Sequence, residues 1–120
     1  MGITKGSCHC GSIQFEVATP ILMFAKCNCS LCSRKNAEIL VIEPEQFTLI
    51  SGQDRLGLYR WNTMKAQHYF CTNCGIYTHH IRRRDDKMGV NRSCLPDLPD
   101  SEIPELQHVD GASQSLVTNL

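Results

Sequence analysis

Three cysteines fall within six residues of the sequence, at Cys27, Cys29 and Cys32. Thiolates bind soft divalent metals such as Zn²⁺, and this C-x-C-x-x-C spacing lets one tight turn direct several sulfurs at one ion. Structural zinc sites usually have four protein ligands, whereas catalytic sites have three and keep a position for water or substrate. The triple therefore predicts a catalytic zinc site with one open position. The alternative is a closed structural site, for which Cys94 is the obvious fourth ligand.

Two further cysteine pairs flank this triple in the sequence, Cys8 with Cys10 and Cys71 with Cys74, each next to a glycine. Two pairs supply the four sulfurs of a tetrahedral site, which predicts a structural zinc that closes the long loop between residues 10 and 71. Such a zinc contributes on the order of 10 kcal/mol to folding in small peptides. In a rival partition, Cys71 and Cys74 join two cysteines of the triple, which leaves the first pair without partners. We therefore expect two Zn²⁺ per chain, the second one labile.

The overall composition narrows the class of protein. The chain has 120 residues, and 12 Lys and Arg balance 12 Asp and Glu. The length fits one zinc-binding domain over residues 1–120. Zero net charge gives no general field toward nucleic acid or an anionic membrane, so we expect neither as a partner. The longest apolar run, residues 21–25, is too short to span a bilayer. Without an apolar leader we expect a cytoplasmic protein, whose reduced thiols favour metal over disulfides.

Hydrophobic alternation predicts an all-β fold. Apolar residues alternate with polar ones over residues 12–18, as in a half-buried strand, and further strand-like runs cover 21–25, 39–42, 47–50, 56–61, 65–70, 76–81 and 88–95. Pro44 at a first helical position predicts a single helical turn. From about residue 96, prolines punctuate an acidic segment without periodicity, which predicts an irregular course. The residues expected in the core are Ile13, Phe15, Val17, Ile39, Val41 and Phe70.

Several polar side chains are candidates to assist chemistry at the triple. His9, His79 and His80 are candidate general bases or hydrogen-bonded bystanders, and the adjacent pair points to opposite faces of its predicted strand. Arg34 and Lys35 follow the triple in a predicted polar turn or single helical turn. These two cations either offset the negative charge of the thiolates or are ordinary solvated charges, and the sequence leaves both readings open.

The cysteine motifs resemble those of one family. The stretches GSCHCGSIQFEV from Gly6, CNCSLC from Cys27 and FCTNCG from Phe70 resemble the glutathione-dependent formaldehyde-activating enzyme family, also called the Gfa or centromere protein V family. The resemblance covers roughly residues 6–95 and implies the Mss4-like fold of small antiparallel sheets with zinc knuckles. It also implies a structural zinc at Cys8, Cys10, Cys71 and Cys74 and a catalytic zinc at Cys27, Cys29 and Cys32.

The family activity joins formaldehyde to glutathione as S-hydroxymethylglutathione, which is carbon–sulfur lyase chemistry. The resemblance therefore implies a glutathione-like thiol and an aldehyde as small-molecule partners. With three thiolates on the metal, we favour activation of an incoming thiol over polarisation of the carbonyl. The main alternative is a non-enzymatic zinc-binding module with a protein-binding or chaperone role, and a third possibility is a relative with an empty or oxidised second site. The sequence leaves the oligomeric state open.

Overall fold

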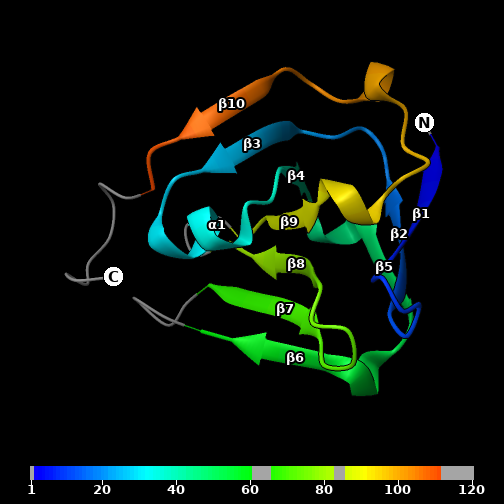
Figure 1. The fold of residues 1–120 in the computed structure, drawn as a ribbon. Coiled ribbons are helices and arrows are strands. Elements are labelled where there is room, and N and C mark those ends of the chain that lie inside the picture. Colours follow the sequence, from blue (N-terminus) through cyan, green and yellow to red (C-terminus); the bar gives the residue numbers. More distant parts are fainter. Residues whose placement is uncertain (1, 61–65, 83–85, 112–120) are drawn as a thin grey trace.

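The computed structural model describes residues 2–60, 66–82 and 86–111. Its strands form two sheets (Figure 1). The smaller sheet has the order β1 (Ile3–Ser7), β2 (Gln14–Ala18), β5 (Phe47–Ser51). The larger sheet has the order β10 (Leu106–Val109), β3 (Met23–Cys27), β4 (Ile39–Ile42), β9 (Met88–Asn91), β8 (Tyr77–Ile81), β7 (Gln67–Cys71), β6 (Leu56–Tyr59). Only β10 and β3 pair in parallel among these strands. This architecture confirms the all-β fold class.

The helical elements in the described residues are short. One α-helix, α1, spans Ser30–Lys35 and follows β3. Four single turns of 3-10 helix lie at Pro44–Gln46, Gln53–Arg55, Arg92–Cys94 and Asp100–Glu102. The turn at Pro44 was predicted from the sequence. In the described part of the chain, no helix is both long and apolar enough to cross a membrane.

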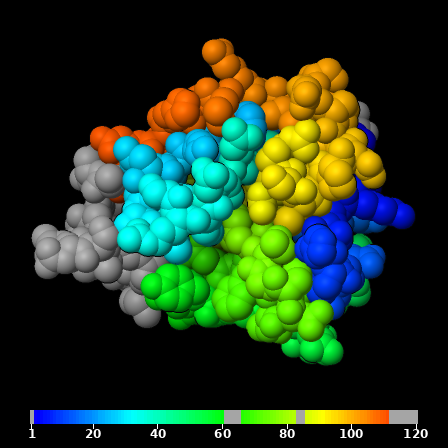
Figure 2. Space-filling view, viewed as in Figure 1, coloured from blue at the N-terminus to red at the C-terminus, as the bar shows by residue number. Residues whose placement is uncertain are grey.

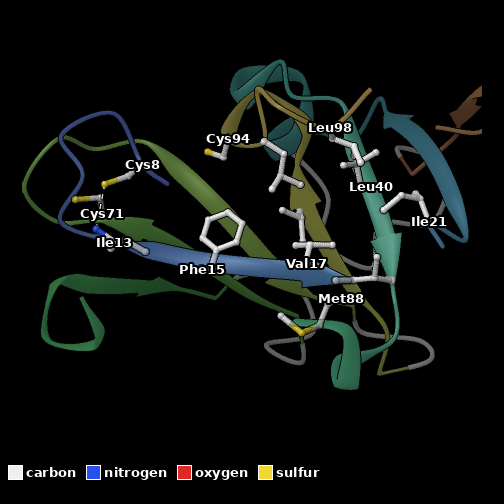
Figure 3. Close-up of a cluster of buried hydrophobic side chains, with 13 residues drawn as sticks. Cys8, Ile13, Phe15, Val17, Ile21, Leu40, Cys71, Met88, Cys94 and Leu98 are labelled. Carbon is white, nitrogen blue, oxygen red and sulfur yellow. Dashed lines mark hydrogen bonds between the residues drawn. The ribbon is translucent and has the colours of Figure 1, made fainter. Parts of the chain in front are cut away.

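The core lies between β2 and the larger sheet. Phe15 and Val17 on β2, with Ile13 just before it, are each at most 1% exposed and share one buried cluster with Leu40 and Val90 of the larger sheet. Figure 3 shows the part of this cluster that includes Phe15, Val17 and Leu40. Alternation with a period of two puts the apolar side chains of β2 on this one face, as the sequence predicted. Figure 3 places Cys8 and Cys71 at one end of this core, so the first cysteine cluster adjoins the packed interior.

The central strand β4 is buried on both of its faces. Leu40 and Ile42 belong to the core cluster, whereas Ile39 and Val41 are buried on the opposite face by alternation. Their burial confirms the prediction, but they do not contact the core shared with β2. The prediction for Phe70 is wrong, because its side chain is only partly buried and lies outside the core cluster.

A β-bulge interrupts the pairing of β7 with β8. Tyr69 pairs with His79, but the next residue on β7 pairs with Tyr77, so Thr78 is an extra residue on β8. A bulge of this kind redirects the side chains that follow it. Tyr77 consequently shares a face with His80, and its hydroxyl hydrogen-bonds to the Nδ1 atom of that histidine. His79 points to the other face and stacks on Tyr69, with ring centroids 4.8 Å apart.

The C-terminal segment is less irregular than predicted. Leu106–Val109 forms β10, which pairs in parallel with β3 along the edge of the larger sheet (Figure 1). The strand depends on main-chain hydrogen bonds to an existing edge, so its short sequence needs no alternation of its own. The sequence also gave no signal for β1, and the predicted strand over 88–95 ends at Asn91.

Candidate metal centres

The first cysteine cluster unites two pairs that are distant in the sequence. The sulfurs of Cys8, Cys10, Cys71 and Cys74 all lie within 4.8 Å of one another. The Sγ atom of Cys10 is 3.7 Å from those of Cys8 and Cys71. Ligands about 2.3 Å from a tetrahedral zinc ion lie about 3.8 Å apart, so this donor set fits zinc. The rival partition, in which Cys71 and Cys74 join the triple, does not occur.

Each half of this cluster is a tight turn with the same local design. Gly11 follows the first pair with φ +82° and Gly75 follows the second with φ +80°, a conformation that glycine adopts without strain. Their N–H groups donate to the carbonyl oxygens of Cys8 and Cys71 and close the two turns. The main-chain N–H of Ile13 donates to the sulfur of Cys8 at 3.3 Å, and that of Cys74 donates to the sulfur of Cys71 at 3.4 Å. These donors stabilise thiolate sulfur, which is the form that binds metal.

The thiols of the first cluster differ in proton affinity. A hydrogen bond with the Ser12 hydroxyl, the largest of several, lowers the pKa of Cys10 to about 5. A main-chain N–H at Ile76 lowers that of Cys74, whereas burial raises the pKa of Cys71 to about 11. Cys71 is completely buried and Cys10 is exposed, so the cluster extends from the core to the surface. This position suits an ion that joins surface turns to the interior.

The second cluster forms where β3 leads into α1. The sulfurs of Cys27, Cys29 and Cys32 lie within 4.8 Å of one another, and all three residues are half-buried. Cys29 is the N-cap of α1, and its sulfur accepts a hydrogen bond of 3.3 Å from the N–H of Cys32. The helix therefore begins within the triple and includes Arg34 and Lys35, for which the sequence predicted a polar turn or a single helical turn. In Figure 2 the segment around α1 (cyan) lies at the surface, so the cluster sits beside solvent.

The pKa values of the thiols in the second cluster are shifted in opposite directions. Hydrogen bonds from the side chains of Cys27 and Cys32 lower the pKa of Cys29 to about 2. Side-chain hydrogen bonds with Cys27 and Cys29 raise the pKa of Cys32 well above its usual range. A cluster that already holds one thiolate among hydrogen-bonding thiols is chemically suited to a divalent metal, which displaces the remaining protons.

Cys94 does not complete either cluster. Its buried sulfur is 3.6 Å from the carbonyl oxygen of Tyr77, and burial raises its pKa to about 11. The thiols that influence it are Cys8 and Cys74 of the first cluster. Among the His, Cys, Asp and Glu side chains of residues 2–60, 66–82 and 86–111, the second group therefore contains three ligands. Cys94 is therefore not placed as the fourth ligand of a closed second site, the alternative that the sequence had left open.

The chain returns to the second cluster after β10. A Cβ atom built on Gly111 would lie 2.4 Å from the sulfur of Cys27 and 3.3 Å from the Cβ atom of Cys29. Only glycine lets the main chain pass this close to the cluster. Nothing in the sequence connects Gly111 with the triple, because most of the chain lies between them.

The two cations of α1 behave differently. Arg34 is exposed, and its guanidinium donates to the carbonyl oxygen of Ser30 in the same helix. Lys35 instead turns inward, with Nζ 3.2 Å from Nδ1 of His68 and 3.7 Å from the ring centroid of Tyr77. Burial lowers the pKa of Lys35, and the nearby thiols oppose this shift. Lys35, one helical turn after Cys32, therefore contacts β7 and β8, whereas Arg34 is a solvated charge.

The three histidines named from the sequence lie in different surroundings. His9 is exposed in the turn of the first cluster, and His79 is buried on the core face between Phe47 and Tyr69. His80 alone lies on the face that Lys35 covers. The sequence analysis missed His68, which pairs with His80 across β7 and β8. Only this pairing of strands identifies His68 as a neighbour of His80, and the pairing cannot be read from the sequence.

Comparisons with known proteins point to one family and agree with the fold. The family model described as "Glutathione-dependent formaldehyde-activating enzyme" matches residues 3–109, from the first residue of β1 to the last of β10. A curated protein of Halomonas elongata, named "Putative glutathione-dependent formaldehyde-activating enzyme", is 29% identical over 85 residues, covering 60% of this chain. The match spans about half, 52%, of that protein's length. A crystal structure of a Rhodobacter sphaeroides protein superposes with a TM-score of 0.77 at 34% identity and covers 88% of this chain and 99% of that one.

Proposed function

Because the chain belongs to the glutathione-dependent formaldehyde-activating enzyme family, we propose that it joins a glutathione-like thiol to formaldehyde or a related aldehyde, or catalyses the reverse. In the forward direction the sulfur of a thiolate adds to the carbonyl carbon, and the π electrons move to the oxygen. A proton then converts this oxygen to a hydroxyl group. The reverse step breaks the same carbon–sulfur bond, so the enzyme is of the carbon–sulfur lyase class.

The observation that carries this proposal is the three-sulfur cluster at the start of α1. Cys27, Cys29 and Cys32 would hold a zinc ion. An ion held there would supply the chemistry that lowers the pKa of an incoming thiol, so that its thiolate forms near neutral pH. Three cysteine thiolates carry more negative charge than one divalent ion balances, which favours a nucleophilic bound sulfur over polarisation of a carbonyl. The half-buried position of the three residues gives a small thiol access.

The first cluster has a structural role in this proposal. Cys8, Cys10, Cys71 and Cys74 would hold a structural zinc ion with all four positions occupied by protein. That ion would link the turn after β1 to the turn after β7 beside the core. A reducing compartment such as the cytoplasm would keep all eight thiols free for this chemistry.

The alternative of a non-enzymatic zinc-binding module predicts that protein ligands close the second site. The placement of Cys94 beside the first cluster removes the ligand that the sequence offered for this closure. The half-buried Lys35, one helical turn after Cys32 and held by His68 and Tyr77, also favours chemistry over a purely structural ion. The enzyme reading is therefore the one that the site supports best.

The test is a direct measurement of adduct exchange. The zinc-loaded protein is mixed with glutathione and formaldehyde, and two-dimensional exchange NMR measures the rate of S-hydroxymethylglutathione formation against the spontaneous rate. We expect acceleration that depends on the second zinc, with Cys94→Ser as the matched control that retains it. A rate equal to the spontaneous one, with two zinc ions bound per chain, would refute the proposal.

A further inference from the structure

A cluster of four polar side chains lies on the face of the larger sheet beside α1. Lys35 reaches from the helix, His68 lies on β7, and Tyr77 and His80 lie on β8; together they are called the Lys35 cluster. Lys35 Nζ is 3.2 Å from His68 Nδ1 and lies over the Tyr77 ring. The Tyr77 hydroxyl hydrogen-bonds to His80, and the two histidine rings are 5.2 Å apart. Each member thus contacts at least one other member.

Two irregular features of the sheet build this cluster. The extra residue Thr78 rotates Tyr77 onto the face of His80, which regular alternation would forbid for residues three apart. Gly89 on β9 makes room for the imidazole, because a Cβ atom there would lie 2.4 Å from Cε1 of His80 and 2.6 Å from Ile39. A bulge and a strand glycine both weaken a sheet. Because the bulge and the glycine both adjoin the same polar side chains, we take this arrangement to serve function rather than stability.

The charge of Lys35 is not paired in the usual way. In the described part of the chain, no carboxylate lies within ion-pair distance of its amine. The negative groups that act on it are the thiols of Cys32, Cys29 and Cys27. Lys35 is half-buried, and withdrawing an amine from water without a carboxylate partner is unfavourable, whereas the neighbouring Arg34 is exposed as charged side chains usually are. The placement becomes favourable if the amine faces negative charge that the second cluster and its substrate supply.

We infer that Lys35 is a catalytic residue of the proposed reaction, in which its ammonium group hydrogen-bonds to the aldehyde oxygen and gives it a proton as the carbon–sulfur bond forms. The inference rests on the proposed function. The sulfur of the thiolate supplies the electron pair of the new bond, the carbonyl π pair moves to oxygen, and one N–H bond of Lys35 breaks as the O–H bond forms. Solvent returns the proton to the neutral amine. In the reverse reaction this amine takes the hydroxyl proton.

The surroundings of Lys35 suit this role. An ammonium group has three N–H donors, and the contacts with His68 and the Tyr77 ring do not use all of them, so a donor remains for a substrate oxygen. His68 remains an acceptor because burial, with the charge of Lys35, lowers its pKa to about 4. His68 and Tyr77 are thus positioning residues that hold the amine. Burial also lowers the pKa of Lys35 itself, which makes its ammonium a stronger acid at neutral pH.

The chain offers a matched pair of variants for the test. Lys35→Met removes the inward cation, and Arg34→Met removes the exposed cation from the adjacent position of the same helix. We expect Lys35→Met to lower kcat for adduct formation about 100-fold, the low end for a general acid, with the KM for glutathione changed less than threefold. Arg34→Met should stay within twofold of wild type. Both variants should retain two zinc ions per chain.

A binding measurement tests the hydrogen bond to oxygen without turnover. Calorimetry compares S-(2-hydroxyethyl)glutathione with S-ethylglutathione, which lacks the hydroxyl group. Wild type and Arg34→Met should bind the hydroxyl compound about tenfold more tightly, as a hydrogen bond to a charged donor allows. Lys35→Met should lose this preference. Equal affinities in wild type would overturn the inference.

The possible failures are distinguishable. A wild-type protein that does not accelerate adduct formation overturns the proposed function and the inference together. An active wild type with Lys35→Met as active as Arg34→Met overturns the inference alone. If Lys35→Met unfolds or loses zinc, Lys35→Arg decides, because arginine keeps the charge but does not release a proton. Its kcat should still fall about 100-fold with zinc retained, and a kcat within threefold of wild type would overturn the proton-donor role.

Discussion

The substitution Cys29→Ser separates the roles of the two metal sites. Cys29 caps α1 through its side chain, and serine is among the best N-cap residues, so the helix should still begin at this position. The residue is half-buried and belongs to a cluster within six consecutive residues, so its loss breaks no long-range link. We therefore expect a change in the free energy of unfolding of at most about 1 kcal/mol.

This free energy converts to a small thermal shift. An unfolding entropy of about 2.1 cal/mol/K per residue gives roughly 250 cal/mol/K for this chain, so 1 kcal/mol moves the Tm by about 4 °C. Cys71→Ser is expected to differ greatly. Cys71 is completely buried at the end of the core, and its cluster joins two distant turns. Losing a structural zinc worth on the order of 10 kcal/mol removes most of the stability of an ordinary domain. The same result is expected for Cys8→Ser.

Three measurements on the same samples test this reasoning. Cys29→Ser should keep its Tm within about 4 °C of wild type, bind one zinc ion instead of two by elemental analysis, and lose thiol–formaldehyde turnover. Cys94→Ser is the matched control for placing a hydroxyl at a cysteine position, and it should retain both ions because Cys94 belongs to neither cluster. If Cys29→Ser unfolds as readily as Cys71→Ser, the second site is structural and the proposed function loses its main support.

Three further predictions follow from the packing. Phe15→Ala removes a 1% exposed ring that stacks on Phe47, so it should cost about 3–5 kcal/mol; a thermal melt by circular dichroism that shifts by less than about 4 °C would contradict this. Gly111→Ala places a Cβ atom against the Cys27 sulfur, so a chelator should remove the second zinc faster than from wild type, whereas Gly2→Ala, with open space around it, should leave the rate unchanged. Burial lowers the pKa of His79 to about 4, so protonation favours the unfolded chain as the pH falls from about 6.5 toward 4. His79→Phe should lose less stability than wild type between pH 7 and pH 5 in urea denaturation, and equal losses would show that His79 does not titrate in this range.

Local sequence was sufficient wherever the physical cause was local. The alternation of Ile13, Phe15 and Val17 identified β2 and its buried face, because side chains on a strand alternate between its two sides. The close spacing of Cys27, Cys29 and Cys32 placed three sulfurs in one turn for the same kind of reason. Specific motifs also identified the family, which the match over residues 3–109 confirms.

Tertiary structure decided what depends on contacts between distant segments. The sequence allowed two partitions of the cysteine pairs, and only the fold brings Cys10 beside Cys71. The sequence did not distinguish Lys35 from Arg34, because neither the residue type nor the position shows which of the two side chains turns toward the sheet. The role inferred for Lys35 depends on the strand register that pairs His68 with His80. It also depends on the β-bulge that places Tyr77 on the same face of the sheet as His80. Register and bulges arise from pairing between whole strands, so no single segment of the sequence encodes them.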